Sequence, residues 1–303
     1  MMKSSKCRTL LSVTIAGFFC SVIPAEASSI LGPDLATFTV LGASAVTNVP
    51  TSTITGNVGV WSSGGANAIT GFNSSPGVAV SDPQVTGGEV QAGTALAQSA
   101  QSQLTTAITD LGSLGAGTTL PSDLSLAGTL APGVYSVPYG TTNLSGALTL
   151  NGEGNANAAW VFQMASSLIT SPNSVVNVIN TGSGAGVYWN VASSATIDTN
   201  TAFLGNILAL SSISMNAAAT DLCGRALAST GAVTLIQNGL SGSCTNTLSG
   251  SGGLSGGLNV ASSGVSFLPY APVNAEHAVP EPDTLALFGL GLLSLGFIRR
   301  WHR

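Results

Sequence analysis

The stretch that decides the fold is "VASSATIDTNTAFLGNILALSSISM", residues 191–215, in which Asp198 is the only charged residue. Within it, "ASSAT" at residues 192–196 is followed by "LSSIS" at residues 210–214, and "ASTGAVT" begins at residue 228 after the same interval. Small and hydroxyl-bearing residues therefore recur at matching positions. A fixed spacing of about 18 residues is typical of repeat proteins, in which each unit stacks on its neighbours.

The same pattern extends toward the N-terminus of this stretch. The aligned segments are "FQMASSLIT" from Phe162, "WNVASSATI" from Trp189, "LALSSISM" from Leu208 and "ALASTGAVTL" from Ala226. The first step between their serine or Ser-Thr pairs is longer than the other two, and an insertion within residues 171–186 accounts for it. A unit of about 18 residues with three short strands has about six residues per side, which predicts a three-sided β-solenoid. A flat antiparallel sandwich is the alternative architecture.

One segment departs from this pattern and predicts a helix at about residues 88–114. It is rich in Ala, Gln and Leu, and its apolar residues recur at helical spacing. These residues are Leu96, Ala100, Leu104, Ala107, Ile108 and Leu111. A single amphipathic helix must bury its apolar stripe, and a flank of the solenoid is the large surface available to it.

Residue triplets after the serine pairs predict which side chains face outward. Each triplet has an apolar middle residue, which we expect to point inward, between two outward residues. The triplets are Ala45-Val46-Thr47, Leu168-Ile169-Thr170, Ser194-Ala195-Thr196, Ser212-Ile213-Ser214 and Ala232-Val233-Thr234. Stacked coils would then carry two parallel outward rows, one of small residues and one of hydroxyl residues. The simpler interpretation is that Thr and Ser suit exposed strand positions.

The charges of the chain exclude several functional classes. Of its seven Lys and Arg residues, only Arg225 lies between the two terminal segments. Of its two histidines, His277 lies in the segment before the C-terminal tail and His302 lies in the tail itself. Nucleic-acid binding needs a basic patch, which this composition cannot form. A Ser-His-Asp set or a His/Cys metal site needs histidines that the part of the chain before His277 lacks. The carboxylates are scattered over separate segments, which does not favour an active site built from clustered acidic residues. We therefore predict a protein that is not an enzyme and has no cofactor.

The N-terminus has the layout of a secretory signal peptide over residues 1–27. Lys3, Lys6 and Arg8 precede the apolar run "TLLSVTIAGFF", and "AEA" at residues 25–27 is a small-x-small cleavage site. Cleavage is expected before Ser28. In the oxidising compartment beyond, Cys223 and Cys244 could form a disulfide, and two buried thiols are the alternative.

The C-terminal residues 280–303 resemble the PEP-CTERM sorting signal of Gram-negative bacteria. Pro280-Glu281-Pro282 precedes an apolar stretch at residues 284–298, and Arg299, Arg300 and Arg303 follow. This stretch is short for a transmembrane helix, which needs ~20 residues. The resemblance implies a secreted or cell-surface protein whose tail is removed by an exosortase-type enzyme. The Gly/Ser-rich residues 246–279 are interpreted as a flexible linker between this tail and a solenoid domain at residues 28–245.

Many short motifs along the chain resemble the ice-binding proteins of sea-ice bacteria, snow-mould fungi and polar diatoms. The motifs include "FTVLGASAVTNVPTSTITGNVGV", "AITGF", "LAPGVYS", "LTLNG" and "GVYWNVASSATI". The resemblance implies a discontinuous right-handed β-solenoid with a helix along one side, in which the two ends of the chain stack out of sequence order.

The implied function is adsorption of a monomer to the surface of an ice crystal. The candidate ice-binding residues are Ala45, Thr47, Thr170, Ser194, Thr196, Ser212, Ser214, Ala232 and Thr234. The alternative is a structural or adhesive protein of the cell surface with exopolysaccharide as its partner, because sorting tails of this kind often accompany exopolysaccharide export.

Overall fold

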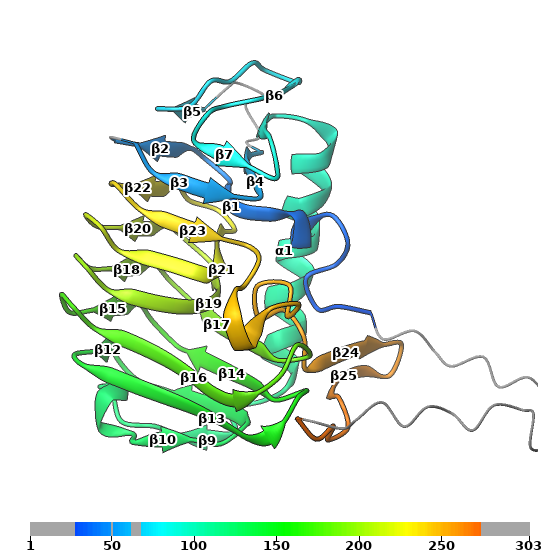
Figure 1. Ribbon diagram of the computed structural model, residues 1–303, viewed down its shortest axis with the longest axis vertical. Coiled ribbons are helices and arrows are strands. Elements are labelled where there is room, and N and C mark those ends of the chain that lie inside the picture. The colour runs from blue at the N-terminus through cyan, green and yellow to red at the C-terminus, as the bar shows by residue number, and fades with distance from the viewer. Residues whose placement is uncertain (1–27, 50, 62–67, 274–303) are drawn as a thin grey trace, which may run out of the picture.

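Residues 28–49, 51–61 and 68–273 are described by the computed structural model. They form a three-sided β-solenoid with one long helix along its side, as the sequence predicts (Figure 1). The first side, named the threonine face, is a parallel sheet of seven short strands. Its strands in spatial order are β12 (Thr142–Leu144), β15 (Leu168–Thr170), β18 (Ala195–Ile197), β20 (Ile213–Met215), β22 (Val233–Leu235), β2 (Val46–Asn48) and β5 (Ile69–Thr70).

The other two sides are named the outer face and the helix face, and β19 (Ala202–Ala209) and β21 (Thr220–Ala228) bend from one to the other. The outer face also contains β10 (Thr129–Leu130), β13 (Ala147–Asn155), β16 (Val175–Thr181), β23 (Gly239–Ser241), β3 (Thr53–Thr55) and β7 (Val85–Thr86). The helix face also contains β9 (Thr118–Thr119), β11 (Gly133–Val137), β14 (Ala159–Met164), β17 (Gly186–Val191), β1 (Phe38–Gly42), β4 (Asn57–Val60) and β8 (Val90–Ala92), with β6 (Ala79–Val80) antiparallel at its end.

The coils do not stack in the order of the sequence. The last full coil packs against the first, because β22 pairs with β2 and β21 pairs with β1. After β8 the chain returns along the whole length of the solenoid as α1 and begins again at the opposite end (Figure 1). The discontinuous stacking expected from the family resemblance is therefore present.

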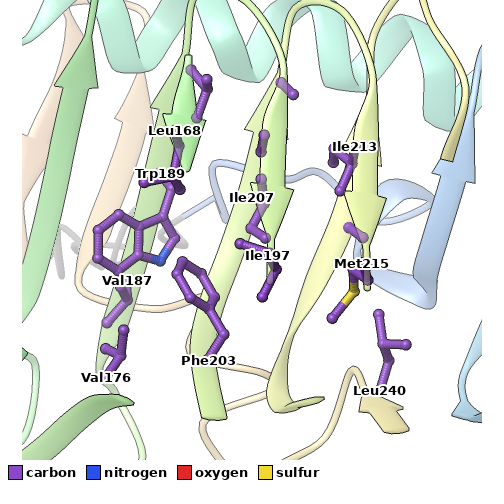
Figure 2. Packing of buried hydrophobic residues seen from close by; sticks show 14 of the residues in the cluster. Leu168, Val176, Val187, Trp189, Ile197, Phe203, Ile207, Ile213, Met215 and Leu240 are labelled. Carbon is purple, nitrogen blue, oxygen red and sulfur yellow. The ribbon is translucent and has the colours of Figure 1, made fainter. Parts of the chain in front are cut away.

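The interior is filled by side chains from all three sides (Figure 2). Tyr135, Phe162 and Trp189 form an aromatic stack across neighbouring coils, with ring centroids 5.7 and 4.2 Å apart, and Phe203 contacts Trp189 at a tilt with centroids 4.9 Å apart. The Nε1–H of Trp189 is not left unpaired, since it donates to the carbonyl of Leu204 at 3.0 Å. A core of this kind needs an apolar residue at every second strand position, which is the pattern of the repeats.

The helix α1 spans Ala95–Ser113, so it begins later than the predicted residue 88. Residues 90–92 pair with β4 as strand β8, and the hydroxyl of Thr94 then accepts from the backbone N–H of Ala97 as an N-cap. The buried side of the helix contacts the helix face of the solenoid. Its buried residues are Ala97, Ala100, Leu104, Ala107 and Leu111.

The repeat length also differs from the prediction in the last coil. Ile213 is paired with Val233, whereas the preceding coil pairs Ala195 with Ile213 at the predicted interval. The last step is therefore longer, and the Ser229-Thr230 pair is out of register with Ser211-Ser212. Serine spacing alone identified the repeat but not each coil's length, because the turns between strands vary.

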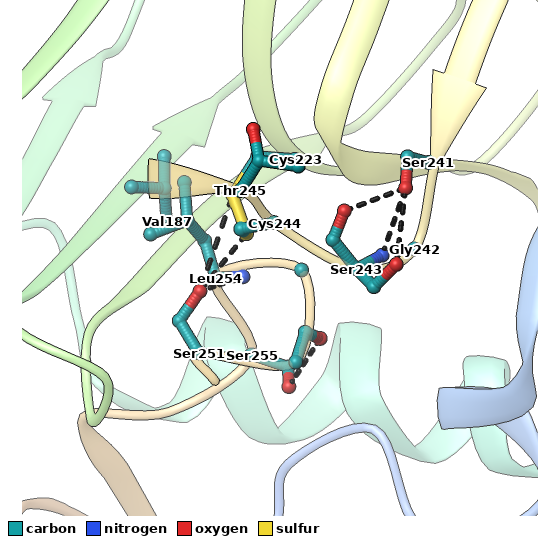
Figure 3. The surroundings of a disulfide bond; sticks show 12 residues. Val187, Cys223, Ser241, Gly242, Ser243, Cys244, Thr245, Ser251, Leu254 and Ser255 are labelled. Carbon is teal, nitrogen blue, oxygen red and sulfur yellow. Dashed lines mark hydrogen bonds between the residues drawn. A yellow bond between two sulfur atoms is a disulfide. The ribbon is translucent and has the colours of Figure 1, made fainter. Parts of the chain in front are cut away.

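The segment after residue 245 is packed structure and not the flexible linker that its composition indicates. It contains a short 3-10 helix, η3 (Asn246–Leu248), and the hairpin of β24 (Leu258–Ala261) and β25 (Gly264–Phe267), and Leu254 is fully buried. Cys223 and Cys244 form a disulfide that joins β21 to the start of this segment (Figure 3). The described part of the expected linker ends at residue 273.

Glycine is abundant in this segment because its backbone lies against the solenoid. A Cβ atom on Gly256 would clash with the carbonyl oxygen of Gly184, and one on Gly253 would lie 2.5 Å from Nη1 of Arg225. Close approach of two backbones is one of the reasons for glycine, and a sequence pattern cannot separate it from flexibility.

Candidate functional site

The threonine face presents one row of outward side chains that crosses all seven strands. Five hydroxyl-bearing residues are consecutive in it, and an isoleucine and an asparagine complete it. The row is Thr70, Thr47, Thr234, Ser214, Thr196, Ile169 and Asn143, each paired with the next. Six of the seven strands have three residues, and each of these contributes one outward residue between two inward ones. The row is regular because parallel strands repeat at ~4.8 Å.

A second outward row lies one position before the inward residues. Backbone hydrogen bonds between successive coils place its members over one another, as in the bond from Ala195 N–H to the carbonyl of Ser212 at 2.9 Å. The row contains Ala68, Ala45, Ala232, Ser212, Ser194 and Ser167. The Oγ atoms of Ser194 and Ser212 accept from the backbone N–H groups of Ser212 and Ala232. These hydroxyls are therefore partly used within the protein.

The hydroxyls of the first row, in contrast, are not bound by other groups of the protein. Among the described residues, the side chains of Thr70, Thr47, Thr234, Ser214 and Thr196 make no hydrogen bond to another protein group. Their oxygen atoms are thus left to bind water, while the methyl groups of the threonines lie between them. The described strands of the threonine face contain no charged residue.

The structure departs from the predicted rows at Thr170. Leu168 is paired with Ala195, and Ile169 with Thr196, so the triplet 168–170 is shifted by one position from its prediction. Thr170 is buried at 1% exposure, and its hydroxyl lies 3.1 Å from that of Thr201 and accepts from the backbone N–H of Asp198. Ile169 takes the outward position, with 41% of its surface exposed. A slip of one residue exchanges the two sides of a strand, which is the error made here.

The other predicted positions lie where the sequence places them. Thr47, Thr196, Ser214 and Thr234 belong to the first row. Ala45, Ser194, Ser212 and Ala232 belong to the second.

Besides Ile169, two members of the first row were missed from the sequence. Thr70 is preceded by Ala68-Ile69, which repeats the small–apolar–threonine order of Ala45-Val46-Thr47 and could have revealed it. Asn143 follows Thr142, a buried polar residue at an inward position, so the apolar signal on which the alignment relied is missing there.

Two acidic residues lie at the border of the threonine face. Asp198 follows β18, and its carboxylate accepts from the side chain of Asn216 and from the backbone N–H of Thr199, which lowers the pKa of Asp198. Asp123 lies beside the strand β12. Partial burial opposes ionisation of Asp123, but hydrogen bonds from Ser145 and Ser125 together hold its pKa below the ordinary value. Both carboxylates are thus paired with protein groups at the border of the face.

The only cation in the described part of the chain is remote from this surface. Arg225 projects from the helix face, is 2% exposed, and donates to Oδ1 of Asn206 and to the carbonyls of Ala36 and Gly252. Burial lowers the pKa of Arg225 to about 10. Its role in the structure is to hold the C-terminal segment against the solenoid.

Residues 40–241, which contain the whole threonine face, match the family described as ice-binding-like. The chain belongs to this family. An ice-binding protein of Nostoc sp. (strain HG1) is 37% identical over 293 residues, which cover 96% of this chain and 94% of the relative. An ice-binding protein of Flavobacterium frigoris (strain PS1) is 32% identical over 215 residues, covering 67% and 72% of the two chains.

Solved structures of the family have the same fold. The crystal structure of an ice-binding protein from an Antarctic biological consortium aligns with a TM-score of 0.60 and 32% identity, over 73% of this chain and 96% of that one. The DUF3494 domain of ice-binding protein 1 from Shewanella frigidimarina aligns with a TM-score of 0.62 and 28% identity, over 72% and 98%.

A PEP-CTERM protein-sorting motif matches residues 278–300, in agreement with the predicted C-terminal signal. This motif, the apolar stretch at residues 284–298 and the predicted signal peptide at residues 1–27 lie outside the described residues. Within the described residues, no helix is long and apolar enough to span a membrane.

Proposed function

We propose that this chain is an exported ice-binding protein that adsorbs to ice through the threonine face. The observation that carries the proposal is the row from Thr70 to Thr196, in which five consecutive coils present a hydroxyl that no other protein group binds. The family, and its relatives that are ice-binding proteins, support the same conclusion.

Ice is a difficult ligand, because liquid water offers the same hydrogen-bonding groups in far greater amount. A protein can distinguish the crystal only by matching its lattice over an area. The threonine face has rows ~4.8 Å apart across strands and nearly 7 Å between alternate residues along a strand, both close to repeats of ice. The unpartnered hydroxyls anchor ordered water, and the threonine methyl groups order the water beside them.

The lack of charge on these strands fits the same mechanism. Lys, Arg, Asp and Glu side chains hold liquid-like hydration and project from a surface, which would separate the sheet from the crystal. Adsorbed molecules force the ice front to curve between them, and this curvature lowers the local freezing point and slows recrystallisation. No bond is made or broken in this process.

The proposal is tested with the exported protein, purified and assayed for ice shaping, freezing-point depression and inhibition of recrystallisation. The wild-type protein should be active, and Thr196→Tyr should abolish the activity because a ring standing out of the face prevents contact over neighbouring coils. Thr196 faces outward, so this change should alter the free energy of unfolding by no more than ~0.5–1 kcal/mol.

Two controls carry the same bulky residue elsewhere. Thr53→Tyr is on the exposed outer face, and Gln98→Tyr is on the exposed side of α1, so both should keep wild-type activity. An inactive wild-type protein would refute the function and leave the cell-surface matrix alternative. A folded Thr196→Tyr protein with full activity, or an inactive Thr53→Tyr protein, would instead refute the choice of face.

A further inference from the structure

The C-terminal end of the described chain lies at the edge of the solenoid that is opposite the threonine face, and the N-terminal end pairs with the hairpin of β24 and β25. Each coil passes from the threonine face to the outer face and then to the helix face, so the edge between the last two, at residues 155–158, is the vertex opposite the first. We name this edge the exit edge. In Figure 1 the strands of the threonine face and the hairpin of β24 and β25 lie on opposite sides of the molecule.

The C-terminal end is attached to the exit edge by specific bonds. The backbone N–H of Val273 donates to the carbonyl of Gly154 at 2.8 Å, and that of Ala271 donates to Oδ1 of Asn155 at 3.0 Å. The hydroxyl of Tyr270 donates to the same Gly154 carbonyl. The N-terminal end is held nearby, because Ser28 pairs with Val260 in the hairpin of β24 and β25.

The segment that leads to this exit is fixed to the body of the protein. Tyr188 donates to the carbonyl of Gly256 at 2.8 Å, and Asn206 donates to the carbonyls of Gly253 and Leu254. Together with Arg225, these buried side chains determine where the chain leaves the solenoid. The sorting motif begins at residue 278, and residues 274–277 can span only roughly 15 Å when fully extended.

The exit edge also exposes large apolar side chains. Tyr270 is 64% exposed, Ile179 is 44% exposed and Phe267 is 39% exposed. Ile179 and Val273 line the same surface groove. Tyr270 combines an apolar ring with a polar hydroxyl, and with the apolar side chains of Ile179 and Phe267 it is suited to lie against an envelope surface.

We propose that the protein acts while it is held on the cell envelope, with the exit edge toward the envelope and the threonine face outward, so that the cell itself adheres to ice. This inference rests on the proposed function. The short tether and the fixed exit make the orientation a property of the fold, since a long flexible linker would allow any face to turn outward.

The orientation is tested by labelling the full-length chain on intact cells of a host that processes the sorting motif. Ser214→Cys places a thiol on the threonine face, and Ser266→Cys places one on the exposed hairpin beside the exit edge. The probe is a membrane-impermeant maleimide that carries a large polyethylene glycol chain. The reference is the rate for the same variant solubilised in detergent.

We expect Ser214→Cys to react on cells as fast as in detergent and Ser266→Cys to react several-fold more slowly on cells. Cells with the wild-type chain should also bind to ice, and cells with Thr196→Tyr should not. The proposal would be overturned if the labelling rates of the two thiols on cells, relative to those in detergent, were the same. It would also be overturned if the chain did not remain on the cells. If the purified protein is active on ice, either result leaves the proposed function intact, whereas an inactive purified protein refutes that function whatever the labelling shows.

Discussion

Ile169 and Thr196 are direct neighbours in the first outward row of the threonine face, where the series of hydroxyls ends. Ile169→Thr should therefore extend the hydroxyl row by one coil and increase ice activity, with a change in stability within ~0.5 kcal/mol. The control is Thr170→Val, which removes a buried hydroxyl and should cost ~1–3 kcal/mol of unfolding free energy while leaving activity per folded molecule unchanged. Freezing-point depression and urea unfolding of both variants decide the register. Loss of activity in Thr170→Val without loss of stability would contradict it.

These two residues also show how far the sequence could predict the site. Small–apolar–hydroxyl triplets identified the inward residues Val46, Ala195, Ile213 and Val233, because hydrophobic alternation is a direct consequence of strand geometry. In residues 168–170 the triplet reads apolar–apolar–hydroxyl, and either Leu168 or Ile169 satisfies the inward position. Only the pairing with the next coil distinguishes them.

The fold was predictable for the same reason, apart from two features that depend on tertiary contacts. The start of α1 was placed too early because Val90, Gln91 and Ala92 suit both a helix and a buried strand, and pairing with β4 decides between them. The C-terminal segment was interpreted as a linker because glycine and serine are also typical of flexible chains. Its order comes from Arg225, Asn206 and Tyr188, which lie far away in the sequence.

The close approach of Gly256 to the solenoid gives a prediction that separates these two interpretations. Gly256→Ala should destabilise the protein, because its Cβ would meet the backbone at Gly184 and the segment would have to move. Gly112→Ala is the matched control on α1, where an added Cβ meets nothing within 4 Å. This substitution should stabilise the helix by ~0.5–1 kcal/mol, because alanine loses less entropy than glycine in a helix. Thermal unfolding and limited proteolysis of the two variants provide the measurement. If Gly256→Ala leaves the stability of the protein unchanged, residues 246–273 behave as a flexible linker.

Burial of Asp221 should make stability depend on pH. The side chain is fully buried, and desolvation raises the pKa of Asp221 well above its ordinary value despite the attraction of Arg225. The folded state therefore favours the protonated acid. Its contribution to stability is complete below the unfolded pKa of about 4 and is lost as the pH rises through the folded pKa.

Asp221→Asn removes this titration and is the comparison to make. Relative to this variant, the wild-type protein should lose stability as the pH increases from about 4 toward neutral. Urea midpoints over this range measure the difference. A constant difference between the two proteins would show that Asp221 does not titrate with folding.

Ala218 occupies a backbone conformation that alanine rarely adopts. Its φ is 59°, and it lies in the turn between β20 and β21, where Asn173, Asn200 and Gln237 have similar positive φ angles in neighbouring turns. The left-handed region costs a residue with a Cβ roughly 1–2 kcal/mol, whereas glycine adopts it freely but loses more entropy on folding. Ala218→Gly should therefore stabilise the protein by ~0.5–1 kcal/mol.

Ala217 in the same turn is the matched control, because its φ is not positive. Ala217→Gly brings the entropy cost of glycine without relief of strain, so it should destabilise the protein by ~0.5–1 kcal/mol. Thermal unfolding of both variants should therefore give shifts of opposite sign, and shifts of the same sign would show that the conformation of Ala218 is not strained. Both residues are in the turn and not on the threonine face, so ice activity should be the same in the two proteins.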